Sequence, residues 1–160
     1  MQVLDIIEGT TVDGPGLRTS IYLAGCKHQC EGCHNPQSWD FDGGKAMSID
    51  EILAVVEENG FNVSLSGGDP MYMAEEAGEL CRRIRSELHK TVWCYTGFVW
   101  EAIVGKAEFM PLLENIDVLV DGPFVLSRRD ISLRFRGSGN QRVIDVKKSL
   151  ETGVVTVLDY

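Results

Sequence analysis

Apolar positions recur along the chain with two different periods, which predicts strands separated by helices. The segment from Ser48 to Glu51 has the order of a capping box, and the apolar positions after it follow a helical period as far as Asn59-Gly60. Residues 77–88 carry a second helical stripe, and residues 99–113 carry a less regular one. Short apolar runs predict strands at residues 20–25, 62–66, 91–96, 116–121 and 141–146, with a further edge strand at 154–158.

Strands that alternate with helices of this length imply βαβ units, so we expect an α/β fold with a mostly parallel sheet. In parallel folds the active site lies at the carboxyl ends of the strands. Residues with unusual chemistry follow four of the predicted strands, in loops that contain Cys26, Ser66, Tyr95 and Asp121. We expect these loops to meet at one rim. At 160 residues the chain is expected to form a single domain, residues 1–160.

Charge and composition narrow the classes of function. The formal net charge of −9 argues against nonspecific nucleic-acid binding, which needs a basic surface. No apolar stretch reaches the ~18 residues of a membrane span, and no signal peptide is recognisable, so we expect a cytoplasmic, reducing location and no membrane partner. Basic residues gather late in the chain, either as a solvated surface or as a patch for a carboxylate, a phosphate or an acidic partner. They are Arg128, Arg129, Arg134, Arg136, Arg142, Lys147 and Lys148.

Cys26, Cys30 and Cys33 form a CxxxCxxC motif on one short predicted loop. Iron–sulfur clusters are bound by cysteine thiolates, usually four, so a group of three leaves one iron open to a small molecule. A zinc site that adds His34 is one alternative, but zinc ligands usually lie two to four residues apart rather than adjacent. A disulfide with a spare thiol is the other, and an odd count of five cysteines in a reducing compartment disfavours it.

Gly67 and Gly68 follow a predicted strand and precede Asp69. A glycine pair of this kind is often only a turn. On the same rim as the cysteine loop, it also allows a ligand to approach the backbone, where carbonyls and a carboxylate suit an ammonium group. We therefore expect this loop to bind the amino end of a ligand that resembles an amino acid.

The CxxxCxxC motif after one strand and the Gly-Gly-acid motif after the next resemble the radical S-adenosylmethionine superfamily. Residues 12–19 (VDGPGLRT) and 33–36 (CHNP) are similar to segments of the glycyl-radical-enzyme activases. Residues 95–97 (YTG), 118–124 (VLVDGPF) and 136–142 (RGSGNQR) resemble the activases of anaerobic (class III) ribonucleotide reductases. The resemblance covers about residues 5–150, and it implies a partial, open (β/α) barrel of the radical S-adenosylmethionine type.

The resemblance also implies a function. Reductive cleavage of S-adenosylmethionine at one [4Fe–4S] cluster, held by Cys26, Cys30 and Cys33, would generate a glycyl radical on the large subunit of an anaerobic ribonucleotide reductase. An electron donor such as a flavodoxin is the second implied partner. The implied cofactor-binding residues are Gly32, His34, Ser66, Gly67, Gly68, Asp69, Thr96 and Asp121, and the implied partner-binding residues are Asp13, Arg134 and Arg136.

Two positions depart from the superfamily pattern, and two other functions remain open. Gly32 stands where an aromatic residue commonly lies near the adenine, and His34 is a candidate to replace that contact. Asp69 stands where glutamate is more common, so backbone carbonyls or water are alternative contacts for the amino group. The other functions are an activase of another glycyl-radical enzyme, such as pyruvate formate-lyase, and a small iron–sulfur electron carrier. Cys81 and Cys94 are expected to lie in the core.

Overall fold

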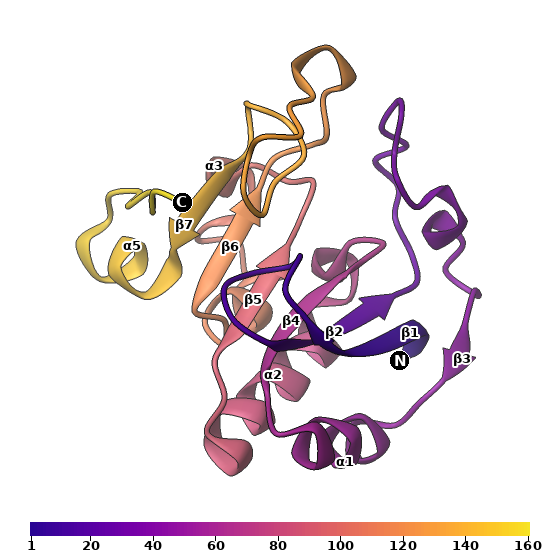
Figure 1. The fold of residues 1–160 in the computed structure, drawn as a ribbon. Coiled ribbons are helices and arrows are strands. Elements are labelled where there is room, and N and C mark those ends of the chain that lie inside the picture. Colours follow the sequence, from indigo (N-terminus) through magenta and orange to yellow (C-terminus); the bar gives the residue numbers. More distant parts are fainter.

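The computed structural model describes residues 1–160 as one seven-stranded sheet with helices packed against it (Figure 1). The strands are β1 (Gln2–Thr10), β2 (Arg18–Leu23), β3 (Lys45–Ala46), β4 (Asn62–Gly67), β5 (Val92–Tyr95), β6 (Val118–Asp121) and β7 (Arg142–Asp145). The helices are α1 (Ile49–Asn59), α2 (Ala74–Leu88), α3 (Trp100–Ile103), α4 (Met110–Leu113) and α5 (Val146–Thr152), with 3-10 turns η1 (Pro36–Trp39), η2 (Pro70–Met73) and η3 (Leu126–Arg128). None of these helices combines the length and the apolar character that crossing a membrane requires.

The strands lie in the order β3-β1-β2-β4-β5-β6-β7. The four strands β2, β4, β5 and β6 are parallel, whereas β1, β3 and β7 pair antiparallel at the two sides. An α/β fold whose sheet is parallel in its middle is therefore confirmed. The sheet is open, because β3 and β7 form its two edges and do not pair with each other.

Side chains that alternate along the central strands separate two faces of the sheet. One face carries residues such as Leu65 and Leu119, which pack with the helices into a core of 24 buried residues. Cys81 and Cys94 are fully buried in this core, as expected. The other face carries a smaller apolar cluster around Trp93. The loop between β1 and β2 crosses this second face in Figure 1.

The structure confirms the predicted ends of α1, which are encoded by residues next to them in the sequence. Ser48 and Glu51 form the complete capping box at the start of α1. Gly60 ends this helix in the left-handed region, with φ of 75°. α2 spans the whole predicted stripe.

The elements that depend on distant partners differ from the prediction. β1 was not predicted, because β-bulges interrupt its register with β2 and break the alternation of its side chains. β7 runs antiparallel to β6, since the chain returns directly through the 122–141 loop without a crossover helix. Residues 154–158 form a single bridge, from Val157 to Ile144, rather than a strand. Residues 99–113 form two short helices, separated by a turn at Gly105 with φ of 76°.

Candidate functional site

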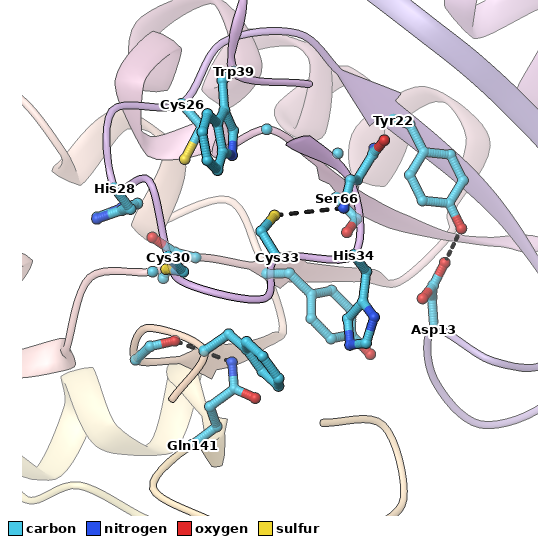
Figure 2. Close-up of a pocket in the computed structure, with 18 residues that line it drawn as sticks. Asp13, Tyr22, Cys26, His28, Cys30, Cys33, His34, Trp39, Ser66 and Gln141 are labelled. Atoms are coloured by element: carbon cyan, nitrogen blue, oxygen red, sulfur yellow. Dashed lines mark hydrogen bonds between the residues drawn. The ribbon is translucent and has the colours of Figure 1, made fainter. Parts of the chain in front are cut away.

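The cysteine loop connects β2 with η1 at the carboxyl end of the central strands. Two backbone hydrogen bonds to η1, of 2.7 and 3.3 Å, hold the start of the loop. Cys26, Cys30 and Cys33 are half-buried and line one cavity (Figure 2). The structure therefore brings all three predicted cluster ligands to the same space.

This cavity has a volume of about 320 Å³, within the range of ligand-binding pockets. Its walls come from the loops that follow β2, β4, β5 and β6, so the four loops meet at one rim as expected. The predicted site residues that line it are Asp13, Cys26, Cys30, Cys33, His34, Ser66, Gly67, Gly68 and Thr96. Gly32, Asp69, Asp121, Arg134 and Arg136 do not line it.

The donors around the cavity suit an iron–sulfur cluster better than a single ion. No three Cys, His, Asp or Glu side chains converge closely enough to bind one metal ion. A zinc site needs such convergence, because its Zn–S bonds are only about 2.3 Å long. A cluster distributes its thiolates over several irons. Burial raises the pKa of the Cys26 thiol, and a bound metal would offset this cost of forming the thiolate.

The two glycines after β4 allow close contact between neighbouring backbones. A Cβ on Gly68 would overlap the backbone of Gly25, directly before Cys26, and a Cβ on Gly67 would overlap the backbone of Leu23. The Gly68 N–H donates to the Leu23 carbonyl at 2.7 Å. The glycine loop thus supports the start of the cysteine loop, in addition to lining the cavity.

Two acidic residues expected to bind the cofactor are buried in hydrogen bonds with the protein itself. Asp69 is 1% exposed and accepts hydrogen bonds from Thr96 and from other groups described below. Asp121 is also 1% exposed, accepts the Trp100 N–H at 2.8 Å and pairs with Arg142 at 2.5 Å. Neither carboxylate lines the cavity.

Gly32 lies beside the cavity, where the loop after β6 packs against it. A Cβ on Gly32 would lie 2.9 Å from Leu126 and 3.4 Å from Phe124. The Phe124 ring also lies 5.2 Å from the ring of His34, and both side chains line the cavity. The loop after β6 therefore places the Phe124 ring beside Gly32, the position where an aromatic residue was expected from the superfamily pattern.

Several lining residues were given no role from the sequence, including Tyr22 and Gln141, and Tyr95 was expected only in a loop at the rim. The Tyr95 hydroxyl is buried and has no hydrogen-bond partner, so a ligand with a polar group can satisfy it. One sequence signal could have identified Tyr95 as a lining residue. It follows the core residue Cys94 on the same strand, and successive strand side chains point to opposite faces of the sheet. Gln141 belongs to the RGSGNQR segment, but nothing in that segment marked it as a lining residue; its side chain donates to the Gly122 carbonyl at 3.0 Å.

The β1–β2 loop is fixed to the sheet by a buried arginine. Arg18 is 2% exposed, and its guanidinium donates to the Ser64 hydroxyl at 2.8 Å and to the Val63 carbonyl at 2.7 Å. Ser64 in turn donates to the Asp13 carbonyl at 2.5 Å, and Tyr22 donates to the Asp13 carboxylate. Asp13 is thereby held at the cavity wall.

A second cavity, of about 570 Å³, adjoins the first one and shares residues with it. Asp13, His34 and Tyr95 line both cavities, and Arg136 lines the second. Arg134 is exposed, and its guanidinium lies 5.0 Å from the ring of Phe135. The predicted partner-binding residues thus lie in or near this second space.

Comparison with known proteins gives consistent matches over most of the chain. Residues 12–144 match the family described as a 4Fe-4S single cluster domain. The chain is similar to the anaerobic ribonucleoside-triphosphate reductase-activating proteins of Vibrio cholerae, at 37% identity over 81% of this chain and 88% of the relative, and of Escherichia coli K12, at 38% over 82% and 90%. The protein of the same name from Haemophilus influenzae is 32% identical over 88% of this chain and 96% of its own length.

Proposed function

Because this chain belongs to the family of anaerobic ribonucleoside-triphosphate reductase-activating proteins, we propose that it activates an anaerobic ribonucleotide reductase as a radical S-adenosylmethionine enzyme. The observation that carries the proposal is the cavity that three cysteines of one loop line together with the glycine loop after β4. We also propose that the open sheet is a partial (β/α) barrel of that superfamily, formed by residues 1–160 as a single domain.

Cys26, Cys30 and Cys33 would hold one [4Fe–4S] cluster, and the iron without a cysteine would take the amino and carboxylate groups of S-adenosylmethionine. With both groups bound and one electron supplied by a donor, the site would provide reductive cleavage of the S–C5′ bond, and through it the removal of a hydrogen atom from a glycine of the reductase large subunit.

The cavity residues bind and orient the cofactor in this proposal. Polar contacts would come from the backbone of Gly67 and Gly68 and from the side chains of Ser66 and Thr96, which line the cavity. The unpartnered Tyr95 hydroxyl supplies one more. On the other side, the rings of His34 and Phe124 offer an apolar surface for the adenine, beside Gly32.

The reductase segment would enter through the second cavity. Asp13 stands between the two cavities, and Arg136 lines the outer one. Neither Arg134 nor Arg136 forms an ion pair within the chain, so both are available for carboxylates of the reductase. An electron donor such as a flavodoxin completes the proposed set of partners.

The alternatives receive less support. An electron carrier needs a fourth protein ligand, and the two remaining cysteines lie in the core on the other face of the sheet. An activase of another glycyl-radical enzyme shares the site, but the relatives named above are activating proteins of the anaerobic reductase.

The test is anaerobic reconstitution with iron and sulfide, followed by reduction with dithionite. We expect methionine release from S-adenosylmethionine and, with the reductase large subunit present, the electron paramagnetic resonance signal of a glycyl radical. Glutamine at both Arg134 and Arg136 should weaken radical formation most at low salt, where charge pairs are least screened, while methionine release persists. A brown protein that releases no methionine would be a carrier, and a radical formed only on a pyruvate formate-lyase would identify the other activase.

A further inference from the structure

The carboxylate of Asp69 joins three loops of the site. Its Oδ2 accepts hydrogen bonds from His28 Nε2 at 2.6 Å, from the Thr96 hydroxyl at 2.9 Å and from the Gly97 N–H at 2.9 Å. Its Oδ1 accepts the Met71 N–H at 3.0 Å. Oδ2 thus takes all the donors that it can accept, and Oδ1, which takes one, lies on a side chain that does not line the cavity. Asp69 is also 1% exposed.

His28 is the point at which the cysteine loop is attached. Apart from a local bond between Cys30 and Cys33, the hydrogen bond that ties residues 27–32 to the rest of the protein is the one from His28 to Asp69. The Lys27 ammonium adds cation–π contacts to the rings of Phe41 and Tyr72, at 5.7 and 5.9 Å. The imidazole ring also packs against Phe98 and Tyr72, with ring centroids 4.6 and 5.4 Å away. Gly97 has no room for a side chain, since a Cβ there would lie 2.5 Å from the His28 ring.

We infer that His28 and Asp69 are positioning residues that hold the cysteine loop in place over the cavity, and that Asp69 does not itself contact the cofactor. The identity of the cluster rests on the proposed function. The hydrogen bond from His28 to Asp69, here called the tether, does not depend on it. A loop of six residues with one hydrogen-bonded attachment loses its fixed position when that bond is removed. The spacing of the three thiolates then depends on a side chain that binds no metal.

The variants separate the tether from general damage to the fold. His28→Leu removes the donor, whereas His28→Gln keeps an N–H donor on a side chain of suitable length. Asp69→Asn replaces one acceptor oxygen by an NH₂ group that faces other donors. Glu31→Gln is the matched control, because this exposed residue of the same loop makes no hydrogen bond or ion pair.

The first measurement uses the reconstituted protein and follows iron release to a chelator. We expect release to accelerate about tenfold in His28→Leu and in Asp69→Asn, in line with the loss of a charge-assisted hydrogen bond. His28→Gln should recover most of the stability of the cluster, and Glu31→Gln should match the unmodified chain. In the Asp69→Asn background, His28→Leu should add little, since the bond is already broken.

The second measurement needs no cluster and uses alkylation rates of single cysteines, read by mass spectrometry under anaerobic conditions. His28→Leu should speed the labelling of Cys30 several-fold, while Cys81 and Cys94 stay protected because both are fully buried. Those two cysteines report any global unfolding.

Three results would overturn the inference. One is a loss of S-adenosylmethionine affinity in Asp69→Asn with unchanged iron release and unchanged labelling, which would make Asp69 a direct ligand. Another is an additive effect of the two substitutions, and the third is equal acceleration at Cys30 and at the buried cysteines. If the unmodified chain takes up no cluster, the proposed function fails, and the labelling rates alone still decide whether the tether exists.

Discussion

The hydroxyl of Tyr22 on β2 donates a hydrogen bond to the carboxylate of Asp13 in the β1–β2 loop. Burial and this bond raise the pKa of Tyr22, so the phenol stays a donor at neutral pH. Tyr22 lines the inner cavity and Asp13 lines both cavities. The pair therefore lies where the inner cavity, proposed to bind the cofactor, meets the outer cavity, proposed to receive the reductase.

Replacement of Asp13 by Ala should uncouple the two activities. We expect cleavage of S-adenosylmethionine without the reductase to persist, while glycyl-radical formation falls about tenfold or more, because a residue that faces the incoming segment is lost. Methionine release and the radical's electron paramagnetic resonance signal measure the two separately. Tyr22→Phe leaves the carboxylate in place and should have a smaller effect. Equal loss of both activities would assign Asp13 to the cofactor or to the fold.

Cysteine substitutions should separate the loop from the core. Cys26→Ala, Cys30→Ala and Cys33→Ala should each abolish the cluster or its turnover, measured as iron content and methionine release. Cys81→Ala and Cys94→Ala should keep both and cost about 1 kcal/mol of unfolding free energy, since each removes one buried sulfur. Retention of the cluster in Cys30→Ala together with its loss in Cys94→Ala would overturn the ligand assignment.

A methyl group on Gly68 should damage the site through the backbone of Gly25. In Gly68→Ala the new Cβ overlaps Gly25, so we expect a loss of about 2 kcal/mol of unfolding free energy and weaker iron retention. Gly139→Ala is the matched control, because a Cβ there meets its nearest neighbour at 3.8 Å. If denaturant titrations give the two variants the same stability, Gly68 has no packing role.

Asp121→Asn should act on stability rather than on the cofactor. The substitution removes the charge that faces Arg142 at 2.5 Å. We expect a loss of about 2 kcal/mol, below the range for fully buried pairs because the Arg142 side chain is 31% exposed. Chemical denaturation gives this value, and isothermal titration with S-adenosylmethionine tests the cofactor role. A large drop in affinity at unchanged stability would restore Asp121 as a cofactor ligand.

Alkaline pH should destabilise the folded chain. Burial raises the pKa of the Cys81 and Cys94 thiols and of the Tyr95 hydroxyl above their ordinary values. The unfolded chain releases these protons from about pH 8.5 for cysteine and pH 10 for tyrosine, while the folded chain keeps them. Because the unfolded state then binds fewer protons, the free energy of unfolding should fall by up to about 1.4 kcal/mol per pH unit for each group.

Denaturant titrations of the cluster-free protein between pH 7 and 10 measure this slope. The double variant Cys81→Ala, Cys94→Ala should flatten it between about pH 8.5 and 10, where tyrosine contributes little. A slope that does not change in the double variant would contradict the assignment to the two thiols.

Features encoded by neighbouring residues follow from the amino-acid sequence by itself. The capping box at Ser48, the end of α1 at Gly60 and the spacing of the three cysteines depend on residues within one or two turns of the chain. Runs of apolar residues likewise predicted the central strands and the loops that follow them, since a buried strand needs apolar residues in its own sequence.

The remaining features depend on contacts between segments far apart in the chain. The pairing of β1 with β2 follows from bulges and register, and the direction of β7 follows from the path of the preceding loop. The sequence shows directly that Asp69 follows two glycines. It does not show the hydrogen-bond partners of Asp69, because His28 and Thr96 lie 41 and 27 residues away in the chain. A carboxylate is free for a ligand only when nearby donors leave it unpaired, and packing alone determines which donors reach it.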